Sequence, residues 1–266
     1  MDIIDINTIF GAFPNQRAES TAEALVDTLS KNEVSQALTL SSWGIHYNDM
    51  SGNQETLRAC SQFKTHLIPV GTINPMQFWD GDEMLKQIVQ TSFGVIRLFP
   101  EKQGWPIDYA PFSRLVDVLS ELGKPLLERE LTLPRATRGW RLWKDSGVPL
   151  MIEITRPGDA TQLQRIVADY PAPVVMVGVT TSTVVEALTV MRMSEQLLIE
   201  THKLAAPDGL GRIRDAVGAD RIVFGSGGPG LSVRASLDYV RKSSLTDAEQ
   251  AAVLGGNASS ILQGGR

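Results

Sequence analysis

Residues 172–179 read APVVMVGV, and this stretch decides the fold because it is apolar at every position and rich in β-branched valine. A strand with one face in water alternates apolar and polar side chains, whereas a strand that is apolar throughout is covered on both faces. The stretch is far shorter than the roughly 20 residues that span a bilayer. It therefore predicts a buried strand of a parallel sheet.

Similar runs recur along the whole chain, separated by segments with the period of amphipathic helices. The strand-like runs are 3–9, 36–41, 67–73, 94–99, 125–130, 149–155, 173–179, 197–202 and 221–226. Strands that alternate with helices predict a parallel α/β architecture. Its sheet is either open and doubly wound or closed into an eight-stranded barrel. No GxGxxG follows the first run, and the length of 266 residues, close to the roughly 250 that are typical of a (β/α)8 (TIM) barrel, favours that barrel.

The ninth run is one too many for a barrel. Residues 125–130 end in successive charged side chains, so we assign them to an insertion at about 125–146. No linker rich in Gly, Ser or Pro divides the chain, which predicts a single domain over residues 1–266.

Helix start signals support this division. Three pairs fit a capping box, in which a polar N-cap side chain is followed three residues later by Glu or Gln. These pairs are Ser20 with Glu23, Asp159 with Gln162, and Thr246 with Glu249. Gly255-Gly256 predicts the end of one helix, and Asn257 the start of another.

Composition excludes several classes of protein. The formal net charge is -5 and no Lys/Arg run could follow a phosphate backbone, so nucleic acid is not an expected partner. The single cysteine, Cys60, excludes a disulfide framework and a CxxC motif. No basic signal segment and no membrane-spanning run is visible, so we expect a cytoplasmic protein without membrane contact.

Five segments of the chain share their pattern with one family of barrels. They are 4–9 (IDINTI), 94–100 (GVIRLFP), 147–153 (GVPLMIE), 218–226 (GADRIVFGS) and 245–258, the last covering a pair of C-terminal helices. They resemble the I-D-x-H-x-H, G-x-K/R-L-x-P, G-x-P-x-x-x-H and G-A-D-R-I-L-F-G-S-D motifs of the amidohydrolase-related (β/α)8 barrels. That family includes metal-dependent hydrolases and enzymes similar to aminocarboxymuconate-semialdehyde decarboxylase. The resemblance implies a hydrolase or lyase that uses zinc or manganese.

The chain departs from the family at the metal ligands. The positions of the two first-strand histidines hold Asn7 and Ile9, and the fifth-strand histidine position holds Glu153. The sixth-strand histidine falls within 178–179 (Gly-Val), and the final aspartate is Gly227. A transition metal needs several N, O or S ligands, so the chain resembles a degenerate branch of the family without a metal centre or another cofactor.

The remaining polar groups at the ends of the predicted strands are the candidate catalytic residues. Glu153 is a candidate general base and His202, with its pKa near neutrality, a candidate acid. Arg97 would bind a substrate carboxylate and Asn7 would orient it. In the alternative, Arg97 and Glu153 form a structural ion pair in the space of the lost metal. Glu200, two residues before His202, could orient the imidazole or pair with Lys203.

Two loops supply candidate substrate-binding residues. Trp43, His46 and Tyr47 follow the second strand and could cover the mouth of the barrel with an aromatic surface. Ser226, Gly227 and Gly228 follow the last strand and could bind an anion through their backbone N–H groups.

These observations leave three functional hypotheses. The first is a metal-free hydrolase or lyase that acts on a small carboxylated substrate, such as a lactone, an amide or a ring-cleavage product, by acid–base chemistry. The second is a non-catalytic descendant that binds a ligand or a partner, and the third is a phosphate-binding barrel enzyme that uses the glycine loop. We favour the enzyme, with a small molecule as its partner and a homodimer as an open alternative.

Overall fold

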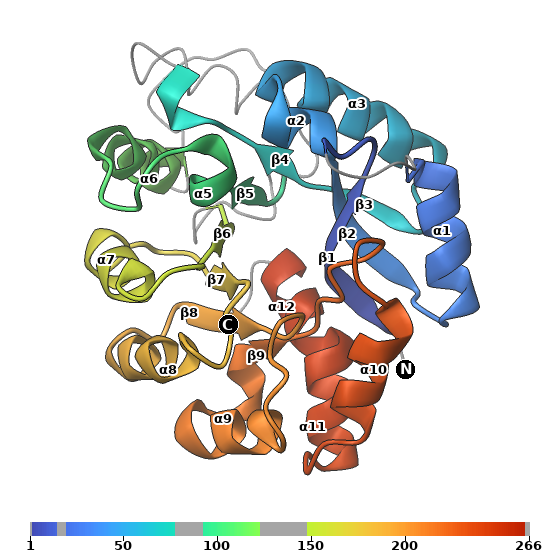
Figure 1. Cartoon of the computed structure of the whole chain (residues 1–266), viewed down its shortest axis with the longest axis vertical. Coiled ribbons are helices and arrows are strands. Elements are labelled where there is room, and N and C mark those ends of the chain that lie inside the picture. The colour runs from blue at the N-terminus through green and yellow to red at the C-terminus, as the bar shows by residue number, and fades with distance from the viewer. Residues whose placement is uncertain (1, 15–19, 78–92, 123–147, 264–266) are drawn as a thin grey trace.

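The structure is a computed structural model that describes residues 2–14, 20–77, 93–122 and 148–263. Figure 1 shows strands in a ring with helices around it. The strands are β1 (Ile4–Phe10), β2 (Gln36–Ser41), β3 (Leu67–Pro69), β4 (Gly71–Thr72), β5 (Ile96–Leu98), β6 (Leu150–Glu153), β7 (Val174–Val177), β8 (Leu197–Glu200) and β9 (Ile222–Val223). The helices are α1 (Ala22–Lys31), α2 (Ser42–His46), α3 (Asp49–Gln62), η1 (Pro75–Gln77), α5 (Pro100–Gln103), α6 (Ala110–Leu122), α7 (Asp159–Ile166), α8 (Val184–Met193), α9 (Gly209–Val217), η3 (Ala219–Arg221), α10 (Val233–Arg241), α11 (Asp247–Ala251), η4 (Ala252–Gly256) and α12 (Asn257–Gln263).

All strand pairs are parallel, in the orders β1-β2-β3 and β4-β5-β6-β7-β8-β9. Val70 joins the two sheets, since its N–H donates to Thr39 O at 2.9 Å and the next N–H donates to Val95 O. At the other edge Ile6 N donates to Phe224 O at 3.0 Å and Ile9 N to Gly228 O at 3.1 Å. The sheet therefore closes, and the predicted (β/α)8 barrel is confirmed with β3 and β4 as two halves of one strand.

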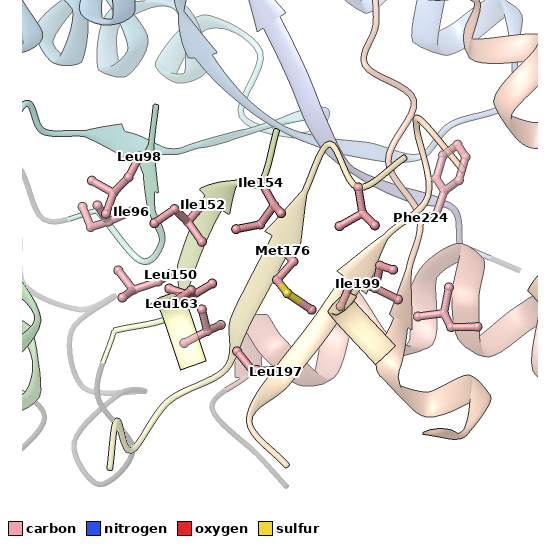
Figure 2. Packing of buried hydrophobic residues seen from close by; sticks show 14 of the residues in the cluster. Ile96, Leu98, Leu150, Ile152, Ile154, Leu163, Met176, Leu197, Ile199 and Phe224 are labelled. Carbon is pink, nitrogen blue, oxygen red and sulfur yellow. The ribbon is translucent and has the colours of Figure 1, made fainter. Parts of the chain in front are cut away.

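The apolar runs are explained by burial on both faces of the barrel. In β7, Val174 and Met176 belong to the layer between strands and helices, and Val175 and Val177 to the barrel interior. Figure 2 shows side chains of this outer layer along neighbouring strands, with Leu163 of α7 among them. The same alternation places Arg97 and Glu153 on interior faces, because each lies two residues from an interior apolar side chain.

The C-terminal helix closes the end of the barrel where β1 begins. Ala258 and Ile261 of α12 pack in the interior cluster with Ile4. The predicted helix end at Gly255-Gly256 is wrong, since the chain continues through the π-helical turn η4 into α12. In the described chain no helix is long and apolar enough to cross a membrane.

Of the three predicted capping boxes, only that of Thr246 and Glu249 forms. Ser20 is extended because its backbone pairs with Gly11, and Thr21 caps α1 instead. Asp159 lies inside α7, after Gly158, and accepts hydrogen bonds from the N–H groups before the helix. The strand-like run 125–130 and the predicted insertion 125–146 lie outside the described residues.

Candidate active site

A cavity of about 250 Å³ lies at the carboxyl ends of the barrel strands, where TIM-barrel enzymes carry their chemistry. Six of the predicted site residues line it, and they come from β1, β5, β6 and the loops after β8 and β9. They are Asn7, Arg97, Glu153, His202, Gly227 and Gly228. The structure therefore brings together side chains that are up to 221 positions apart, as the span from Asn7 to Gly228 shows.

One wall of the cavity carries a hydrogen-bonded ionic cluster. Arg97 Nη1 donates to Asn7 Oδ1 at 2.7 Å, and Arg97 Nη2 lies 3.7 Å from Glu153 Oε1. Lys102 of α5 donates to the same Glu153 oxygen at 2.6 Å. Both cations also lie over the ring of Phe99, with Arg97 Cζ at 4.7 Å and Lys102 Nζ at 5.1 Å from its centroid. Glu153 is thus shared by two cations.

The lining also contains an imidazole that is held by a buried carboxylate. Glu200 is fully buried; its Oε1 accepts from the backbone N–H of His202 at 2.7 Å, and its Oε2 contacts the Nδ1 atom of the same histidine. A Cβ atom at Gly225 would lie 2.1 Å from Glu200 Oε1, so only glycine leaves room for this carboxylate. The Nε2 atom of His202 is thereby left for a ligand.

Two glycines flank the imidazole. Gly178 has φ +82° and Gly227 has φ +71°, a region that glycine adopts without strain. A Cβ atom at Gly178 would lie 3.7 Å from His202 Cε1, and one at Gly227 would lie 3.0 Å from His202 Cδ2. The ring therefore borders Gly227, the position of the family's final aspartate, and Gly178, one of the two residues among which the family's sixth-strand histidine falls.

The glycine-rich loop is held by its own polar groups. Gly227 N donates to Asn7 O at 3.0 Å, and Gly228 N donates to Ser226 Oγ at 2.9 Å. Ser226 is fully buried and its N–H donates to Asp5 Oδ1 at 3.0 Å. The N–H groups that the phosphate hypothesis needs are therefore already bonded within the protein.

Burial shifts the pKa of two ionisable groups, Asp5 and Arg97, in this part of the barrel. Asp5 is fully buried, which raises its pKa from 3.8 to about 6, against the hydrogen bonds from Ser226 and Asn7. Burial also lowers the pKa of Arg97, while the carboxylates of Glu153, Glu200 and Asp5 oppose that shift. Several buried polar atoms here accept or donate no hydrogen bond within the described residues, among them Asp5 Oδ2, Asn7 Nδ2 and Arg97 Nε.

The three candidates after β2, Trp43, His46 and Tyr47, lie outside the lining of this cavity, and the predicted loop is largely the short helix α2. Trp43 and Tyr47 stack on each other with centroids 4.4 Å apart, and both are about half exposed. His46 faces the ring of Phe13, which does line the cavity, at 6.4 Å. Burial, together with Lys102, lowers the pKa of His46.

The side chains of this site do not fit a divalent transition metal. Glu153 is held by Lys102 and Arg97, and the oxygen of Asn7 accepts from Arg97. In the described parts of the chain, no three His, Cys, Asp or Glu side chains are grouped as metal ligands. Cations and hydrogen-bond donors stand where a metal would need electron-pair donors.

Sequence reasoning missed two cations that line the cavity, Lys102 and Lys203, and two apolar side chains, Phe13 and Leu231. Lys102 comes three residues after Phe99 in a short helix, and Lys203 follows His202 directly. Their position just beyond the strand ends is the only sequence signal that could have identified them.

Comparison with known proteins supports the fold at low sequence identity. An uncharacterised TIM-barrel protein from Bordetella bronchiseptica superposes with a TM-score of 0.71 at 15% identity, covering 100% of both chains. A 2,6-dihydroxybenzoate decarboxylase complexed with 2,6-dihydroxybenzoate gives 0.71 at 10% identity, covering 98% of this chain and 99% of that one. A dihydroxybenzoic acid decarboxylase from Polaromonas with bound manganese and an inhibitor gives 0.67 at 11%, covering 98% and 96%.

No curated protein sequence matches the chain. The sequence model of the Amidohydrolase family, however, matches residues 53–263, most of the chain and all strands from β3 to β9. The chain belongs to the amidohydrolase family.

Proposed function

We propose that this protein is a hydrolase or lyase that acts on a small carboxylated molecule by acid–base catalysis without a metal ion. His202, oriented by Glu200, gives and takes the proton, and Glu153, which lines the same cavity, is the second acid–base group. Arg97 holds Glu153 and Asn7 in place.

The observation that carries this proposal is the position of the imidazole. His202 borders Gly227 and Gly178, and the family resemblance implies one metal ligand at 227 and another within 178–179. Glu200 holds the Nδ1 atom of His202. A carboxylate on Nδ1 fixes the tautomer and leaves Nε2 to exchange a proton with a substrate. An acid–base pair would thus take over from the metal as the activating group.

The cavity and the comparisons support the class of substrate. Its volume, about 250 Å³, suits a small molecule, and Ile9, Phe13 and Leu231 provide an apolar surface for a ring or a short chain. Two of the similar structures are decarboxylases of dihydroxybenzoates. A small ring carboxylate is therefore the first substrate class to assay.

The test is turnover of a panel of ring carboxylates and their lactones by the purified protein in the presence of a chelator. We expect His202→Asn to lower kcat about 100-fold or more, the usual contribution of a general acid or base. Glu200→Gln should lower kcat less, because its amide oxygen can still accept a hydrogen bond, although the variant no longer provides a carboxylate to both the backbone N–H and the Nδ1 atom of His202. His66→Asn, which changes a histidine outside the cavity, is the control and should be unaffected.

Two results would overturn the proposal. One is activity that the chelator abolishes and manganese restores. The other is a His202→Asn variant that is as active as the wild type.

The ionic cluster of Arg97, Lys102 and Glu153 favours a second candidate, a binding protein without catalysis. Arg97 and Lys102 are engaged by Glu153 and cover Phe99, as expected if the pair had become structural. This candidate predicts that a panel ligand binds in the cavity but is recovered chemically unchanged.

A further inference from the structure

Lys203 differs from the other cations of the cavity because its charge is not matched by an acidic side chain. It is exposed, lines the cavity and follows His202 directly. Within the described residues, no hydrogen bond or ion pair engages its ammonium group, since Glu200 is directed to His202 instead. Its ammonium group is therefore available to a ligand.

Arg97 and Lys102, by contrast, are committed within the protein. The side chain of Arg97 is 3% exposed and its two terminal nitrogens face Asn7 and Glu153. Lys102 donates at 2.6 Å to Glu153. A ligand that recruited either of them would have to compete with a carboxylate that is already in place.

The backbone keeps a path to the ammonium group open. A Cβ atom at Gly178 would lie 3.8 Å from Lys203 Nζ, so any larger side chain at position 178 would extend beside the ammonium group and the imidazole. With glycine there, both groups face the same space.

We propose that Lys203, rather than Arg97, is the residue that selects an anionic ligand for this cavity. It holds the acidic group of the ligand beside His202 while Ile9, Phe13 and Leu231 contact the apolar part. This inference rests on the proposed function, because it assigns the substrate class and its orientation in the same site. The cations of the lining outnumber its carboxylate, although the whole chain has a formal net charge of -5, so the mouth attracts anions selectively.

The test uses two probes of nearly the same shape, benzoate and neutral benzamide, titrated calorimetrically into the full-length protein. We expect the wild type to bind benzoate more tightly than benzamide. Lys203→Met should weaken benzoate binding about tenfold and leave benzamide binding unchanged, because only the charged probe loses a partner. Lys203→Arg should restore most of the benzoate affinity.

Two further variants serve as controls. Lys64→Met removes one charge from an exposed position outside the cavity and should change neither affinity. Lys102→Met should weaken benzoate binding less than Lys203→Met does. The melting temperature of each variant shows whether it is folded.

Three outcomes would overturn the inference: no measurable benzoate binding by the wild type, equal loss of both probes in Lys203→Met, or a larger loss of benzoate in Lys102→Met. The readout is binding and not turnover. Failure of the proposed acid–base chemistry would therefore leave a Lys203 effect on benzoate visible, and the two failures are distinguishable.

Discussion

Asp5 lies at the seam where the two ends of the barrel meet. Its Oδ1 atom accepts from the N–H groups of Asn7 and Ser226, at 2.9 and 3.0 Å. The side chain therefore joins β1 to the loop after β9, and its second oxygen is buried without a partner in the described chain. The oxygen of Asp5 thus stabilises the fold by accepting these hydrogen bonds, while burial of its negative charge lowers the free energy of unfolding.

This arrangement predicts how stability depends on pH. The pKa of Asp5 is about 6 in the folded state and 3.8 when exposed, so between these values the folded protein keeps a proton that the unfolded chain has released. Stability attributable to Asp5 then falls as pH rises from about 4 to 6, by up to about 3 kcal/mol. Asp5→Asn keeps an acceptor oxygen and removes the charge, so its urea-unfolding free energy should lack this decline.

The unfolding free energy of the wild type is the reference for that of Asp5→Asn. All other ionisable groups titrate in both proteins, so their contributions cancel in the difference. The relevant quantity is the difference between the two unfolding free energies at pH 4 and pH 7. A difference that does not change with pH would contradict the burial argument.

At the scale of elements, η4 and β1 are in close contact through one of two adjacent glycines. A Cβ atom at Gly255 would lie 2.0 Å from the carbonyl oxygen of Asp2, whereas at Gly256 the nearest atom would be 3.7 Å away. Gly255 therefore serves the contact between the helix and the start of β1 rather than a helix end.

The two glycines form a matched pair of variants. Gly255→Ala should destabilise the protein by about 1–3 kcal/mol, because the clash is with backbone that no rotamer can avoid. Gly256→Ala should be neutral or stabilise by about 0.5–1 kcal/mol through its higher helix propensity. Chemical denaturation measures the unfolding free energy of both variants. Equal changes in the two would show that the contact between Gly255 and Asp2 does not determine stability.

At the scale of the whole molecule, closure of the barrel brings several cations to one end of an acidic chain. Arg97, Lys102 and Lys203 face the cavity with Glu153 as the carboxylate of its lining. Such a mouth repels a divalent cation and offers it few free electron pairs.

We therefore expect metals to have little effect on stability. A metal that binds the folded protein and is present at a concentration 100 times its dissociation constant would raise the free energy of unfolding by about 2.7 kcal/mol. A protein of this size would then melt several degrees higher. Thermal denaturation with a chelator, zinc or manganese should instead give melting temperatures within about 1 °C of one another. A rise of several degrees with either metal, or stoichiometric metal in the purified protein, would contradict our assessment of the site.

The fold could be predicted from the sequence because the same pattern, an apolar strand followed by an amphipathic helix, is repeated along the chain. Most strands are buried on both faces, so runs such as Val174–Val177 are recognisable without any knowledge of their neighbours. The same order places Arg97, Glu153 and His202 at or just after strand ends, where a barrel collects its functional groups. Departures from the family motif also identified residues 178–179 and Gly227 as positions without metal ligands.

Only the tertiary structure decided which of these groups pair. The sequence left Glu200 open between His202 and Lys203, and gave no sign that Lys102 would contact Glu153. A register shift in β1 between Asp5 and Thr8, near the point where Asn7 contacts Arg97, could not be recognised in the sequence either. The physical reason is that residue spacing along a strand determines the face on which a side chain lies, whereas its partner depends on the register and closure of strands distant in the chain.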